Sequence, residues 1–180
     1  DALIGRAQYV ITSIGGVDES VLGTLEKLPG ILASPIVQGS AVAPEKQQTV
    51  MVLGVDARRD ARLRDYRPDA LAEADLPTLL VRGDAIIVPR SLAGRMGWSL
   101  RSTARLVGPS GPAEFRVGGI LRDDGVAAAL GGNLVILNLD AARTLLSRAG
   151  RFDRIELGMS GAATRETVEA ALPERCSLQA

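Results

Sequence analysis

Residues 8–30 read QYVITSIGGVDESVLGTLEKLPG and predict a strand followed by a helix. Residues 8–14 are rich in β-branched and aromatic side chains and end at Gly15-Gly16, which is typical of a strand before a turn. Asp18 is a suitable N-cap for the helix, and Pro29-Gly30 ends it. Between these limits the apolar residues recur at helical spacing, as Val21, Leu22, Leu25 and Leu28.

The first third and the last third of the chain share a strand-helix-strand plan. Residues 32–37 and 49–55 predict two further strands, separated by a polar loop. Strands are also expected at residues 134–137 and 154–159, and each is followed by a helix. The first of these helices begins at Asn138 or Asp140, and the second begins at Thr164. The two ends of the chain should therefore pack together as one layer.

The middle of the chain has a different character. A short strand is expected at residues 85–88, followed by a short helix capped by Ser91. Residues 103–107 and 114–120 predict a hairpin, because Pro109-Ser110-Gly111-Pro112 lies between them and favours a turn.

These elements predict an α+β fold made of two parts. The first is a split β-α-β layer built from residues 1–55 and 133–180. The second is an inserted β-rich lobe built from residues 56–132.

The composition excludes several classes of protein. The 21 basic and 21 acidic side chains give no net charge and only 3% of the residues are aromatic, which argues against a nucleic-acid-binding protein. The chain has no histidine and one cysteine, so it lacks Ser-His and Cys-His pairs, histidine-ligated zinc and an internal disulfide framework. Its longest apolar run is residues 126–130, far short of the roughly 20 residues of a membrane span.

No catalytic, cofactor-binding or metal-binding residue is predicted. The sequence has no G-x-G phosphate-binding motif, no P-loop lysine and no serine-nucleophile motif. One enzymatic alternative stays open, a soluble hydrolase that uses paired carboxylates in a cleft between the two parts, since such chemistry needs only two well-placed acids. A free-standing ligand-binding protein is a further alternative, and it would require an enclosed pocket.

Three isolated features of the sequence are candidate sites. Asp123-Asp124-Gly125 suggests a calcium loop, but the residues that follow supply no oxygen ligands, which favours a turn. Cys176 follows Arg175 in what reads as a tail after the last helix, so an activated thiol is the functional interpretation. Trp98 is interpreted either as an exposed anchor for a partner or, preferably, as packing.

Residues 56–69 form a run in which five arginines alternate with four aspartates. One interpretation is a contact patch for anionic lipid or a partner. The preferred interpretation is a solvated surface loop whose charges pair with one another, with one short helical turn.

Several short motifs then occur in a familiar order. They are Leu53-Gly54-Val55-Asp56, Ala85-Ile-Ile-Val-Pro-Arg-Ser-Leu-Ala93, Met96-Gly97-Trp98, Arg105-Leu106, Phe115-Arg-Val-Gly-Gly-Ile120, Asn133-Leu-Val-Ile-Leu-Asn-Leu-Asp-Ala-Ala-Arg143 and Phe152-Asp-Arg-Ile-Glu156. In this order the chain resembles the MacB-like periplasmic core domain of FtsX-type ABC transporter permeases. It departs from that family at Arg101-Ser102, where Gly and a small polar residue are common, and at Ala57, where Pro is common.

The resemblance implies that the layer of residues 1–55 and 133–180 is porter-like and that the lobe of residues 56–132 is sabre-like. It also implies a non-catalytic, extracytoplasmic domain of a transporter in the cytoplasmic membrane. ATP hydrolysis by a partner subunit or domain would move the membrane helices, and this domain would transmit that motion to export or extract a lipid-linked, peptide or small-molecule substrate. Its expected partners are a second permease subunit, an ABC ATPase, and an extracytoplasmic adaptor or lipid-linked substrate. The resemblance further implies membrane helices before Asp1 and after Ala180 in the parent protein, and no cofactor in this domain.

Overall fold

The computed structural model describes residues 7–73 and 75–180, and its main feature is a ten-stranded mixed sheet. The strands are β1 (Tyr9–Ser13), β2 (Val17–Asp18), β3 (Ile31–Ala43), β4 (Gln48–Val55), β5 (Pro68–Leu71), β6 (Ala85–Pro89), β7 (Thr103–Gly108), β8 (Gly111–Leu121), β9 (Leu134–Asn138), β10 (Arg151–Phe152), β11 (Arg154–Met159) and β12 (Cys176–Gln179). The helices are α1 (Ser20–Glu26), α2 (Ala57–Asp60), α3 (Leu76–Val81), α4 (Arg90–Met96), α5 (Val126–Ala129), α6 (Leu139–Leu146) and α7 (Arg165–Ala171).

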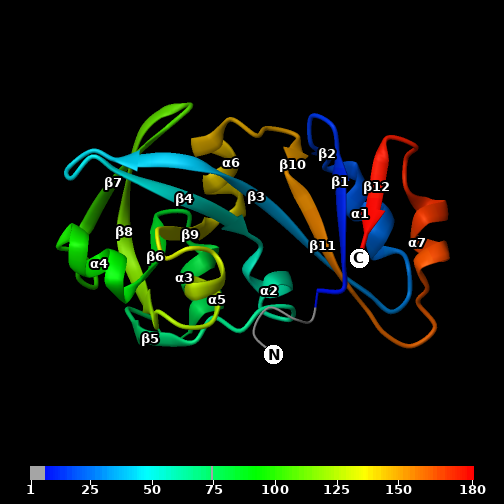
Figure 1. Ribbon diagram of the computed structural model, residues 1–180, viewed down its shortest axis with the longest axis horizontal. Coiled ribbons are helices and arrows are strands. Elements are labelled where there is room, and N and C mark those ends of the chain that lie inside the picture. Colours follow the sequence, from blue (N-terminus) through cyan, green and yellow to red (C-terminus); the bar gives the residue numbers. More distant parts are fainter. Residues whose placement is uncertain (1–6, 74) are drawn as a thin grey trace.

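The two ends of the chain build one layer of the molecule together. The strand order begins β12-β1-β11-β3, so strands from both ends alternate, and all these pairs are antiparallel. Helices α1 and α7 pack together beside these strands, on the right of Figure 1. Val10 lies opposite Gln179, so the start of β1 and the end of β12 are neighbours at one end of the sheet.

Strand β3 links this layer to the rest of the molecule and is longer than the predicted strand at residues 32–37. Its first half pairs with β11, and from Ile36 onward it pairs with β4. Pro35 is tolerated because the pairing with β4 begins only at Ile36, which leaves one side of the backbone at Pro35 without a strand partner. Figure 1 shows β3 crossing the molecule from one part to the other.

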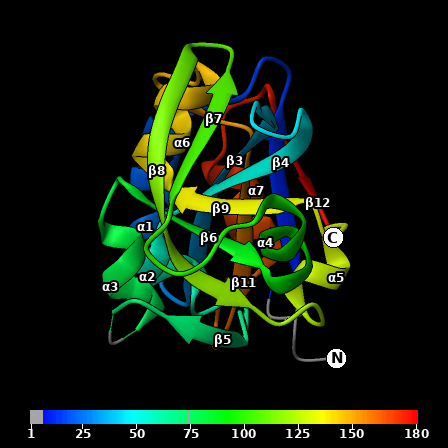
Figure 2. The same cartoon turned by 90° about the vertical axis from the view of Figure 1, so that its left-hand side faces the viewer.

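The sheet continues as β4-β9-β6-β8-β5, and β7 then connects β8 back to β3. The contact between β7 and β3 is the single pair Val42 and Val107. This part of the sheet therefore curves until it nearly closes on itself, as Figure 2 shows. Helix α6 contacts β3, β4, β7, β8 and β9 and fills this curved face. The predicted hairpin is confirmed as β7 and β8.

The central strands are buried on both faces. In β9, Val135 and Leu137 belong to the larger apolar core, whereas Leu134 and Ile136 belong to a second core beneath α2 and α3. This explains why the segment reads as a continuous apolar run rather than as an alternating strand.

The fold confirms the α+β class and the shared layer of the chain ends. The strands of residues 56–132 are joined to that layer through β9 and β7 by hydrogen bonds. The division into 1–55 with 133–180 and an inserted 56–132 stays a prediction. No helix within residues 7–73 or 75–180 is long and apolar enough to cross a bilayer.

Three local predictions are wrong. Helix α1 has Glu19 rather than Asp18 at its N-cap, and the Asp18 carboxylate accepts the N–H of Ser20, the first residue of the helix, at 2.9 Å. Helix α4 begins at Arg90 after Pro89, so Ser91 lies inside its first turn and does not cap it. The carboxylate of Asp123 accepts the Ser91 N–H instead, at 3.0 Å. Cys176 does not lie in a tail, because it begins strand β12 opposite Ser13.

Candidate functional site: a buried ionic junction

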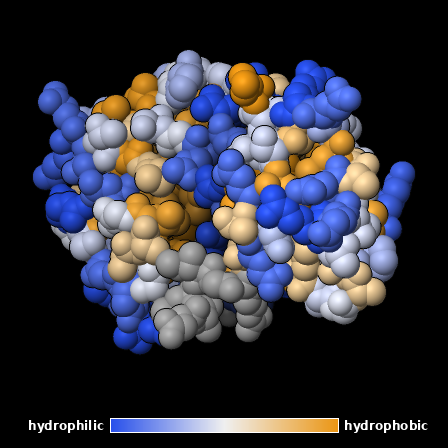
Figure 3. All heavy atoms as spheres, turned by 45° about the vertical axis from the view of Figure 1, so that its right-hand side comes forward, coloured by the Kyte–Doolittle hydropathy of each residue, from blue (hydrophilic) through white to orange (hydrophobic). Residues whose placement is uncertain are grey.

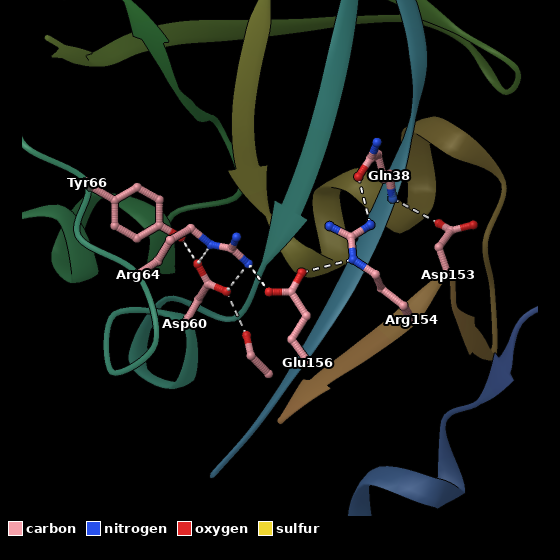
Figure 4. Close-up of polar contacts among 8 residues, drawn as sticks. Gln38, Asp60, Arg64, Tyr66, Asp153, Arg154 and Glu156 are labelled. Carbon is pink, nitrogen blue, oxygen red and sulfur yellow. Dashed lines mark hydrogen bonds and ion pairs between the residues drawn. The ribbon is translucent and has the colours of Figure 1, made fainter. Parts of the chain in front are cut away.

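A buried carboxylate, Asp60 at the end of α2, lies where α2 and the loop after it pack against β3 and β11. Its side chain has no exposed surface. It accepts hydrogen bonds from the Ser34 hydroxyl of β3 at 2.7 Å, from Arg64 Nε at 2.9 Å, and from the Tyr66 hydroxyl. Figure 4 shows Asp60, Arg64 and Tyr66 pointing at one another. A buried polar group has to be paired with hydrogen-bonding partners, and these three donors supply them for Asp60.

Arg64 connects Asp60 to a second buried carboxylate. Its Nη2 lies 2.7 Å from Glu156 Oε1 on β11. Desolvation lowers the pKa of Arg64, but its hydrogen bond to Asp60 and the charges of Asp60 and Glu156 outweigh this and raise the pKa above its ordinary value. One guanidinium therefore holds two carboxylates, one from α2 and one from β11.

The chain of polar contacts continues along β11. Arg154 donates to Glu156 Oε2 at 2.9 Å and to Gln38 Oε1 at 2.7 Å. The Gln38 N–H in turn donates to Asp153, which also pairs with Arg148 after α6. We call the residues Ser34, Asp60, Arg64, Tyr66, Arg154 and Glu156 the ionic junction.

The ionic junction is suited to fixing geometry rather than to reacting with a substrate. Both of its buried carboxylates contact Arg64, so neither offers a free base or a free acid. Among the described residues, neither Asp60 nor Glu156 lines any of the cavities that follow. The ionic junction therefore does not supply the two free carboxylates that the hydrolase would need.

The surface carries open grooves. One, of about 480 Å³, is lined by Ile31, Leu32, Ala33, Asp56, Arg58, Arg59 and Arg62, and we call it the arginine groove. A second, of about 600 Å³, lies at the turn after β1, and Arg175 and Cys176 are among its lining residues. A third, of about 400 Å³, contains Arg82, Arg101 and Arg116. On the face drawn in Figure 3 most of the surface is hydrophilic, and apolar residues gather near a hollow in its middle.

Comparison with known proteins gives a fold and no sequence family. No family model matches the chain, and no curated protein matches it. Among solved structures, the periplasmic region of MacB from Actinobacillus actinomycetemcomitans superposes with a TM-score of 0.67 at 13% identity, covering 98% of this chain and 89% of that one. The chain has the fold of the MacB periplasmic region.

Two further structures agree with the MacB-like fold. The extracellular domain of the ABC-type transporter YknZ from Gram-positive bacteria gives a TM-score of 0.67 at 11% identity, covering 95% of this chain and 98% of that one. A domain assigned to a permease of Porphyromonas gingivalis gives 0.57 at 15% identity, covering 97% and 90%. The fold implied by the sequence motifs is therefore confirmed over nearly the whole chain.

The structure differs from the preferred interpretation of the charged run, residues 56–69, as a solvated loop. The run contains one helical turn, α2, as predicted. However, Asp60 and Arg64 are buried, and Arg64 pairs outside the run with Glu156. The interpretation as a wholly solvated, self-paired loop is wrong because β3 and β11 cover the middle of the run.

The isolated candidates fall in separate places. Trp98 is only 6% exposed and packs in the larger core, so it is not an exposed anchor. Cys176 is half-buried on β12. Asp123 accepts the Ser91 N–H, and Asp124 pairs with Arg67 and Arg122. Among residues 7–73 and 75–180, no three metal-ligating side chains of the His, Cys, Asp or Glu type come together.

Sequence reasoning missed Glu156 as a member of a site. In β11 it alternates with Ile155 and Leu157, which is the pattern of a solvent-facing residue. It is nevertheless only 7% exposed, because the loop after α2 covers this face. The only signal was a charged run with an aromatic residue, Tyr66, in its midst.

Proposed function

We propose that this chain is the extracytoplasmic domain of an ABC transporter permease in the cytoplasmic membrane. The observation that carries the proposal is the fold, which matches periplasmic or extracellular transporter domains over 95% or more of this chain. The adjacent start of β1 and end of β12 support it, because a domain inserted between two membrane helices needs its two connections side by side.

The proposed role is non-catalytic transmission of motion. ATP hydrolysis by an ABC ATPase would move the membrane helices of this permease and of a second permease subunit. The domain would carry that motion outward to an adaptor or to a lipid-linked, peptide or small-molecule substrate. The ionic junction supports this role, since it ties β11 of the terminal layer to the loop after α2 by charge-assisted hydrogen bonds in a buried setting.

Labelling of the full-length protein in cells tests the location. We replace Cys176 and any other cysteine, and then introduce Glu45→Cys in the exposed turn after β3. A membrane-impermeant maleimide should label this cysteine in intact spheroplasts, and the protein should sediment with membranes. Labelling only after lysis, or a protein found free of membranes, would show that the proposal is wrong.

A second experiment tests transmission. Glu156→Gln in the full-length transporter should leave the domain folded and the ATPase active but weaken the coupling between ATP hydrolysis and substrate movement. Glu169→Gln, which alters an exposed ion pair with Arg165 on α7, is the matched control. Equal coupling in both variants would contradict a transmitting role for the ionic junction.

A further inference from the structure

The arginine groove carries an excess of positive charge beside an apolar strip. Three guanidinium groups, those of Arg58, Arg59 and Arg62, line it together with a single carboxylate, Asp56. Glu26 pairs with Arg59 at its edge, so among the described residues at this groove three arginines stand beside two carboxylates. A planar guanidinium matches the oxygens of a phosphate group by paired hydrogen bonds.

The rest of the groove's lining comes from the first residues of β3. Ile31 and Leu32 there are only partly buried, although both are large and apolar. A site lined by both cations and aliphatic side chains suits a ligand that joins a phosphate to hydrocarbon.

The strand register places this groove at the same end of the molecule as the start of β1 and the end of β12. Ile31 pairs with Met159 and Ala33 with Leu157, and Leu157 pairs with Tyr9 of β1 on its other side. Gln179 lies opposite Val10 at that same end. The turn after β3 and the strand β7 lie toward the other end of β3.

We infer that the arginine groove binds the phosphate head groups of acidic lipids at the membrane surface. The inference rests on the proposed function in one respect, since flanking membrane helices would hold this end of the domain against the head groups. Basic residues held near an anionic surface each add attraction to it, so a shallow, open groove suffices when the domain is tethered there. The groove would then set the resting orientation of the domain on the membrane.

Sedimentation of this chain with lipid vesicles tests the inference without the transporter. The vesicles are phosphatidylcholine alone or phosphatidylcholine with about one third phosphatidylglycerol. The chain should bind the acidic vesicles more tightly than the neutral ones, and added salt should weaken that binding. Equal binding to both, or no binding to acidic vesicles, overturns the inference.

Charge reversal locates the binding surface. Arg58→Glu with Arg62→Glu should weaken binding to acidic vesicles by at least about tenfold. The control, Lys46→Glu with Arg105→Glu, makes the same change of charge at the other end of the molecule, where both residues are exposed. Arg58→Gln with Arg62→Gln keeps hydrogen-bonding groups and should still weaken binding, and unchanged circular dichroism checks that each variant is folded. An equal loss in the control pair overturns the assignment.

A titration with inorganic phosphate distinguishes binding of lipid head groups from binding of a free anion. Inorganic phosphate titrated against this chain should give no saturable binding at millimolar concentration. Saturable phosphate binding without vesicle binding would overturn the lipid assignment. The location of the domain is tested separately by maleimide labelling, so failure here leaves the proposed transporter role standing.

Discussion

Gly54 of β4 faces Ala142 of α6 so closely that a β-carbon built on Gly54 would lie 2.3 Å from the β-carbon of Ala142. Real β-carbons do not approach that closely, so this strand and helix pack together only because residue 54 has no side chain. Both residues belong to the motifs on which the family resemblance rests, Leu53 to Asp56 and Asn133 to Arg143. The two motifs therefore meet in space as one packing contact between β4 and α6.

Gly54→Ala should destabilise the fold by about 1–3 kcal/mol, because the added methyl group forces α6 away from the sheet. The matched control is Gly23→Ala in α1, where a β-carbon would meet nothing within 4 Å. That change should be neutral or stabilise by up to about 1 kcal/mol, since alanine favours helix. Urea unfolding followed by circular dichroism measures both, and a Gly54→Ala variant as stable as Gly23→Ala would contradict the close packing.

The sequence predicted most strands and helices because their periodicity and turn residues are local. The helix at residues 139–146 begins as expected, since the Asn138 side chain accepts the Asp140 and Ala141 N–H groups. The ionic junction could not be predicted in the same way. Arg64 and Glu156 are 92 positions apart and find each other only after β3 and β11 have paired. Burial of a charge depends on what covers it, and no local pattern records that.

Arg101 is held in the left-handed region, with φ at 72°, at a position where the family that the sequence resembles often has glycine. This conformation places the β-carbon close to the following carbonyl oxygen and costs about 1–2 kcal/mol for a residue other than glycine. Arg101→Gly should therefore be more stable than Arg101→Ala by about 1 kcal/mol, because both lose the side-chain bond to the Ala72 carbonyl and only glycine relieves the strain. Thermal unfolding of the two variants is the measurement, and equal melting temperatures would show that Arg101 carries no strain.

Asp123 supplies the capping group that α4 lacks locally. Its carboxylate accepts from the backbone and side chain of Ser91, and these hydrogen bonds lower the pKa of Asp123 below the ordinary value of 3.8. A carboxylate whose pKa falls on folding adds stability above its unfolded pKa and loses it as the pH falls through the folded pKa. The expected benefit is therefore fully present at neutral pH and is lost progressively as the pH falls below the ordinary value of 3.8.

Asp123→Ala should cost about 1 kcal/mol at neutral pH, as for the loss of other helix caps. Asp123→Asn keeps an acceptor oxygen and should cost less. The stability gap between wild type and Asp123→Asn should narrow as the pH falls below the ordinary aspartate value, because the wild-type carboxyl then takes up a proton. Unfolding curves across acidic pH measure this gap, and a constant gap would argue against a charge-dependent cap.

Glu156→Gln tests whether the ionic junction holds the loop after α2 against β11. The change removes a charge that contacts both Arg64 and Arg154 in a buried setting, so it should cost about 1.5–3 kcal/mol. Arg64 keeps its contact with Asp60, so the fold should survive while the contact between the two parts weakens. Hydrogen exchange should then become faster in residues 57–66, through local opening, while β1 and β12 stay protected.

The control for this experiment is Glu169→Gln, whose carboxylate pairs with Arg165 on the surface of α7. Exposed pairs of this kind contribute little, so the free energy of unfolding should change by less than about 0.5 kcal/mol and residues 57–66 should exchange as in wild type. If Glu156→Gln speeds exchange evenly over the whole chain, the buried pair contributes to global stability alone. Faster exchange confined to residues 57–66 would show that Arg64 holds the loop after α2 against β11 through its contacts with Asp60 and Glu156.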